Sequence, residues 1–200
     1  MSAWSEDLQP LFANGPWEPG MYPNAWDELL NDVFATRTGG PSMVKFGINE
    51  TIYFVPTTLE SAGTFHRFLV QARRRGAELP LMERKTALLI QIEPEHRLSS
   101  KYWRGMVDHE LRSGMEEMRS EYPGTVIHGI AAFGWRIAIY SKTGENPIDP
   151  PRPPLDAQAD LAPELLFDLD IRNVDGADRL KEVAEQVKAA FAASDATDKA

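Results

Sequence analysis

The apolar run TALLIQIE at residues 86–93 constrains the fold of this chain more than any other feature. It has no clean alternation of apolar and polar residues, which is typical of a strand that is covered on both faces of a sheet. Such a strand needs other strands beside it and helices above and below it. We therefore predict that residues 86–93 form the central strand of an α/β domain.

Periodicity and turn residues predict the other elements of that domain. Helices are expected at residues 25–36, 59–76, 101–120 and 177–192. Strands are expected at 42–48 and 51–56, which form a hairpin at Asn49-Glu50, and at 125–134, 135–141 and 165–171. The predicted fold class is α/β, with a mixed central sheet of about five or six strands flanked by helices.

Prolines and aromatic residues divide the chain into a body and three less regular segments. Residues 1–23 form an N-terminal arm rich in prolines and aromatic rings, which excludes a regular helix or strand there. The single α/β domain spans 24–192 and includes a proline-rich strap at 143–163. Residues 193–200 are expected to be a flexible tail.

Charge and composition exclude several classes of function. The chain has 21 basic and 30 acidic residues, a net charge of −9, which argues against a general nucleic-acid binder. It has no cysteine and no apolar run that spans a bilayer, so we expect a protein of the cytoplasm or nucleus without membrane contact. Residues 61–120 alone are basic, with 11 basic and 8 acidic groups, and this permits one local anionic ligand.

The second half of the chain carries a spaced set of residues that points to a known family. The set comprises Pro94, Gly129, Ile130, Ala132, Gly134, Asp168, Asp170, Ile171, Gly176 and Lys188. In this order and spacing the chain resembles, over roughly 85–190, a group of small, largely uncharacterised fungal proteins from mushroom-forming species. In those proteins a strand leads into Glu-x-Lys-Pro-Pro, then a helix, then a second strand.

The Glu-x-Lys pattern is also the signature of the restriction-endonuclease-like fold, so the resemblance implies a core of that kind. That chemistry needs acids for Mg²⁺ and a lysine to position water. The aligned residues here are Gln91, Ile92 and Glu93, and no aspartate occurs between Asp32 and Asp108. We therefore expect a disabled or repurposed site, and no metal or other cofactor.

The candidate site residues surround the end of the central strand. Glu93, His128 and His96 are the candidate catalytic residues, because a carboxylate and imidazoles can move protons. A more specific alternative is a divalent metal ion bound by Glu93, Glu95 and His96. The competing interpretation is that Glu95 and His96 lie in an exposed loop and bind no metal. Candidate binding residues are Gln91, Arg136, Trp135, Trp103 and Arg104. A pocket between the long helix and the sheet, with Glu93, His128 and Arg136 at its rim, is where we expect a small ligand.

Three functions compete on this basis. The first is a binding or interaction module, a pseudo-enzyme on a degraded nuclease-like scaffold, that takes a protein partner or a small anionic ligand or forms a homodimer. The second is a small-molecule enzyme, such as an isomerase, cyclase or hydrolase, with Glu93 as general acid/base. The third is an active Mg²⁺-dependent nuclease, which the sequence supports least because the required acid and lysine are missing.

Overall fold

The computed structural model describes residues 4–13, 22–34, 44–55, 63–74, 85–119, 126–153 and 160–197. Its sheet has six strands in sequence order, and all neighbours are antiparallel except β3 and β4, which are parallel. The strands are β1 (Val44–Val55), β2 (Gly63–Arg74), β3 (Lys85–Glu93), β4 (Val126–Phe133), β5 (Arg136–Thr143) and β6 (Leu169–Asp170). This arrangement confirms the predicted α/β class with a mixed sheet.

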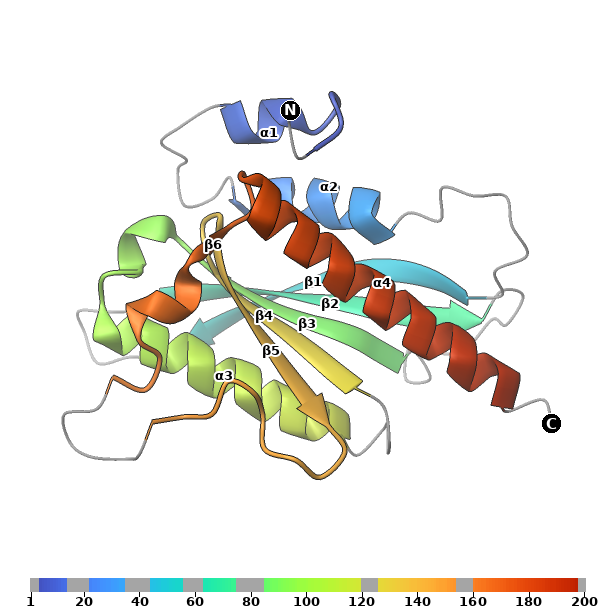
Figure 1. The fold of residues 1–200 in the computed structure, drawn as a ribbon. Helices are drawn as coiled ribbons and strands as arrows, with labels where there is room; N and C mark the ends of the chain where they lie inside the picture. Colours follow the sequence, from blue (N-terminus) through green and yellow to red (C-terminus); the bar gives the residue numbers. More distant parts are fainter. Residues whose placement is uncertain are drawn as a thin grey trace.

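Helices cover both faces of this sheet (Figure 1). The elements are α1 (Gln9–Ala13), α2 (Tyr22–Phe34), α3 (Lys101–Arg119) and α4 (Val174–Thr197), with short 3₁₀ helices η2 (Glu95–Arg97) and η3 (Glu164–Phe167). One hydrophobic cluster joins α2 and α4 to one face of the sheet, and a second joins α3 and η3 to the other face. The parallel pair β3 and β4 is connected through α3, as such pairs require.

The central-strand prediction for residues 86–93 is confirmed. β3 lies between β2 and β4, and its side chains enter both clusters. Leu88, Ile90 and Ile92 pack on the α2 and α4 side, whereas Leu89 packs on the α3 side. A strand buried from both sides cannot alternate between apolar and polar residues, which explains its composition.

Two predictions for the first half of the chain are wrong. Within the predicted helix at 59–76, residues 63–74 are instead strand β2, paired with β1 and β3. The spacing of the apolar residues in this segment fits a helix or a strand. Pairing with β1 and β3 satisfies its backbone hydrogen bonds and favours the strand. Asn49-Glu50 is not a turn either: β1 runs through it, with Asn49 opposite Leu69, because β2 offers a partner of equal length.

The ends of the chain are more regular than predicted. Within the predicted arm, residues 9–13 form α1, and α2 already begins at Tyr22. The predicted strand at 165–171 is mostly η3 followed by the two-residue strand β6. Helix α4 continues to residue 197 through most of the predicted flexible tail. None of the helices in the described ranges is long and apolar enough to cross a membrane.

Candidate functional site

Glu93 ends β3 on the face that α3 covers, since it shares the parity of Leu89. The side chain is fully buried, and Arg97 Nη1 donates to its Oε2 at 2.5 Å. Its Oε1 is also buried and has no hydrogen-bond partner among the described residues. Burial raises the pKa of Glu93 to about 7, and Arg97 offsets this only in part.

The short helix η2, which follows β3, connects Glu93 to other elements. The guanidinium of Arg97 stacks 3.8 Å from the centroid of the half-buried Trp103 ring, so Arg97 links Glu93 to the start of α3. His96 is exposed in η2. Glu95 accepts a hydrogen bond from Tyr22 at 3.3 Å and lies 4.0 Å from Arg172. These contacts tie η2 to α2 and to the turn between β6 and α4.

Gln91 lies two residues before Glu93 on the same face and is also buried. Arg67 of β2 donates from Nε to Gln91 Oε1 at 3.2 Å, and its Nη2 lies 3.4 Å from Glu110 Oε2 on α3. A cation therefore bridges the strand and the helix beside Gln91.

The structure does not bring Glu93, His128 and Arg136 together. His128 has the parity of Ile130, which packs on the α2 and α4 side, so it lies on the opposite face from Glu93. Its imidazole is buried, with Nδ1 unpartnered among the described residues; burial first, and then Arg179, lower its pKa. Arg136 donates from Nε to the carbonyl of Phe167 at 2.6 Å. The predicted rim of three residues does not form.

Two further candidate binding residues, Trp135 and Arg104, are buried. Trp135 is fully buried, and its ring packs against Trp26, Tyr22 and Phe12 at centroid distances of 5.0–6.3 Å. Arg104 is buried and donates to the carbonyls of Leu98 and Ala162 at 2.6 and 2.8 Å. It also pairs with Asp160. These two residues hold the fold together around the candidate site.

A second charged group lies further along α3. Asp108 is fully buried on this helix. Arg112 Nε donates to its Oδ1 and Arg152 Nε to its Oδ2, each at 2.7 Å. Arg152 comes from the proline-rich strap, so one carboxylate joins helix and strap. The buried Nη2 of Arg152 has no hydrogen-bond partner among the described residues.

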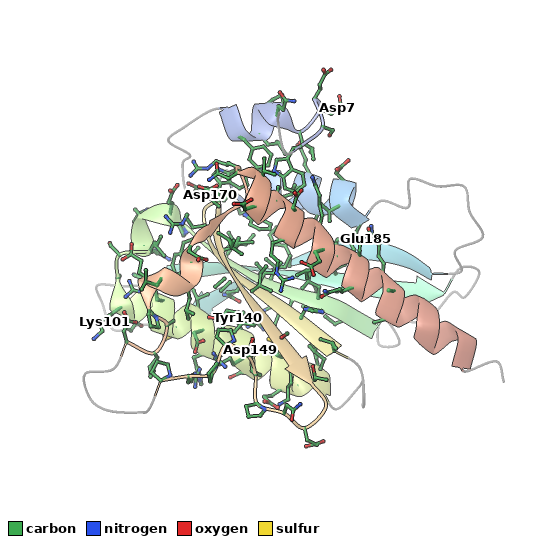
Figure 2. The ribbon with its side chains drawn as sticks, viewed as in Figure 1. Asp7, Lys101, Tyr140, Asp149, Asp170 and Glu185 are labelled. Carbon is green, nitrogen blue, oxygen red and sulfur yellow. The ribbon has the colours of Figure 1, made fainter. Side chains whose placement is uncertain are left out.

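The strap is held in place by backbone contacts as well. Ser141 and Asp149 exchange two backbone hydrogen bonds of 2.8 Å, and Figure 2 shows Tyr140 and Asp149 close together on the α3 side of the sheet. Arg112 donates to the carbonyls of Ile148 and Pro150 at 3.4 and 2.5 Å. The first part of the strap is therefore docked on α3.

A pocket of about 510 Å³ opens between α3 and the docked strap. Its lining residues are His109, Arg112, Ser113, Glu116, Pro147, Ile148, Pro151 and Arg152. The helix supplies polar and charged groups, and the strap supplies two prolines and an isoleucine beside Arg152. Glu116 is paired with Lys142 of β5, which faces the same side.

Sequence reasoning missed this pocket. The only local sign of it in the sequence is the spacing of Asp108 and Arg112. They are four residues apart and therefore lie on one face of the helix. Arg152 lies 40 residues further along in a segment with no periodicity, so only the docking of the strap brings it to Asp108.

Comparison with known proteins adds no relative to this picture. No protein-family model matches the chain, and neither the curated proteins nor the solved structures contain a significant match. Within the described residues, no group of three or more histidine or acidic side chains is placed to hold a metal ion.

Proposed function

We propose that this protein is a binding module for a small anionic ligand, which it holds in the pocket between α3 and the strap. The observation that carries the proposal is the sharing of one buried carboxylate, Asp108, by two arginines at the pocket wall. Two guanidinium groups and one carboxylate leave one positive charge in excess. An anion in the pocket would pair with that charge by charge-assisted hydrogen bonds.

The exposure of Arg152 supports the same proposal. Its side chain is 32% exposed and lines the pocket, so its guanidinium can donate to an anion held there. The chain as a whole has a net charge of −9, so a positively charged pocket wall is a local feature of this site. Arginine suits this role because its planar fork matches carboxylate and phosphate oxygens.

The nuclease-like scaffold depends on the resemblance alone, and the contacts of Gln91 bear only on its metal site. The Arg67 guanidinium beside Gln91 repels a divalent cation, so the position favours a scaffold that has lost its metal site over an active Mg²⁺-dependent nuclease. A protein partner and a homodimer stay predictions, since no described contact bears on either.

The enzyme alternative depends on Glu93. Its raised pKa suits a general acid/base near neutral pH. A general acid/base must also come within hydrogen-bond reach of its substrate, and Glu93 is fully buried and does not line the described pocket. The binding module therefore has the stronger support.

Arginine side-chain NMR tests the proposal on the full chain. Acetate, phosphate and phenylacetate, titrated against chloride at constant ionic strength, are expected to shift the Nε–H signals of Arg112 and Arg152. The Arg152→Gln variant is expected to lose the shift at Arg112, whereas Arg179→Gln on α4 keeps it. If none of the three anions moves either signal, the pocket is not an anion site.

A further inference from the structure

The charges around the pocket limit the charge of its ligand. Arg112 and Arg152 exceed Asp108 by one positive charge, and Glu116 with Lys142 adds none. Glu116 also lines the pocket, but Lys142 neutralises it and leaves no further positive charge for a ligand. A monoanion therefore matches the single excess charge, whereas a second negative charge on the ligand would have no partner.

The apolar part of the wall limits the shape of the ligand. Pro147, Ile148 and Pro151 line the strap side of the pocket, beside the Arg152 guanidinium. A volume of about 510 Å³ lies in the range of pockets that take small organic ligands. An inorganic anion would leave the apolar wall without a contact, whereas a ligand with an apolar body would bury it.

We infer that the ligand is an organic monocarboxylate with an apolar body, an inference that depends on the proposed anion-binding function. The carboxylate would accept hydrogen bonds from the guanidinium of Arg152, whose side chain is 32% exposed, while Arg112 is held by Asp108 and by two strap carbonyls. The body would pack on the two prolines of the strap. Ser113 and His109 on α3 supply further polar groups at the opposite wall.

Calorimetric titration with four matched probes tests this class. Phenylacetate has both a carboxylate and an apolar body. Acetate has only the carboxylate, and 2-phenylethanol has only the apolar body. Inorganic phosphate has no apolar body and carries a second negative charge on most molecules above neutral pH. We expect phenylacetate to bind at least tenfold more tightly than each of the other three probes.

Three variants assign the binding to the pocket. Arg152→Gln should weaken phenylacetate binding at least tenfold, and Pro147→Ser should weaken it severalfold. Arg152→Lys keeps the positive charge and serves as the second variant if the glutamine variant is unfolded; it should bind more weakly than the wild type because the fork is lost. Arg179→Gln, on the opposite side of the sheet, is the matched control and should bind like the wild type.

The outcomes separate this inference from the proposed function. Phosphate that binds as tightly as phenylacetate and is lost in Arg152→Gln overturns the monocarboxylate and leaves the anion site standing. Absence of binding by every probe overturns both. Phenylacetate binding that is unchanged in Arg152→Gln and Arg152→Lys places the ligand elsewhere and overturns the inference.

Discussion

Glu93 shows how one residue responds to its surroundings in this fold. The carboxyl is fully buried at the end of β3, and a single arginine contact does not replace the hydration it has lost. Its pKa is therefore raised to about 7 by burial, although Arg97 favours the charged form. Glu93 is neutral over much of the acidic range in the folded state.

This raised pKa predicts a pH-dependent stability. Between about pH 4.5 and pH 7, folded Glu93 keeps a proton that the unfolded chain has released. The free energy of unfolding therefore falls by about 3 kcal/mol as the pH rises through this window. Glu93→Gln removes this dependence, so its stability relative to the wild type should increase by about that amount from pH 4 to pH 8.

Urea denaturation of both proteins at each pH measures the difference. Glu185→Gln, on the exposed face of α4, shows whether loss of a carboxylate alone produces the effect. A constant difference between wild type and Glu93→Gln across the range would contradict the buried, protonated carboxyl.

At the scale of elements, the close approach of α4 to β6 sets how the last helix joins the sheet. Gly176, in the first turn of α4, lies against the backbone of Asp170, and a Cβ there would come within 2.2 Å of the Asp170 carbonyl oxygen. Trp135 and Ile171 add a backbone hydrogen bond of 3.1 Å at the same junction. Glycine is therefore required at position 176, because any Cβ would meet backbone atoms.

We expect Gly176→Ala to destabilise the protein by roughly 1–3 kcal/mol or more, because backbone atoms must move to accept the methyl group. Gly105→Ala is the matched control: Gly105 lies within α3, and its Cβ would meet nothing within 4 Å. That substitution should stabilise by about 1 kcal/mol through helix propensity. Thermal and urea unfolding measure both, and equal effects of the two substitutions would contradict the close approach.

The same scale explains which elements could be predicted. β3, α3, β4 and β5 carry strong local patterns, so their bounds were found to within one or two residues. The segment at 63–74 fits a helix and a strand equally well, and its structure depends on β1 and β3. The pocket likewise depends on a strap whose sequence has no period.

For the whole molecule, residues 4–13 of the N-terminal segment pack against the core. Trp4 is nearly fully buried, and its Nε1 donates to the carbonyl of Ile171 at 2.6 Å, 167 residues away in the chain. Its ring stacks on Phe12 at 5.8 Å, and Phe12 in turn contacts Trp135. The N-terminal segment thus packs over the junction between β6 and α4.

Trp4→Ala should therefore lower the free energy of unfolding by about 3–5 kcal/mol, as for other buried aromatic residues. Gln9→Ala, an exposed position on the neighbouring α1, is the control and should change it by less than about 0.5 kcal/mol. Urea denaturation followed by circular dichroism measures both. Equal stability of Trp4→Ala and wild type would show that the segment does not contribute to the core.

The sequence by itself determined the α/β class, the central strand at residues 86–93 and the long helix that follows it, because these depend on local periodicity and on burial from both sides. Only the tertiary structure decided that His128 and Glu93 face opposite sides of the sheet, that residues 63–74 are a strand, and that Asp108 holds Arg152. The physical reason is that each of these depends on pairing or docking between segments distant in the chain, for which no local pattern exists.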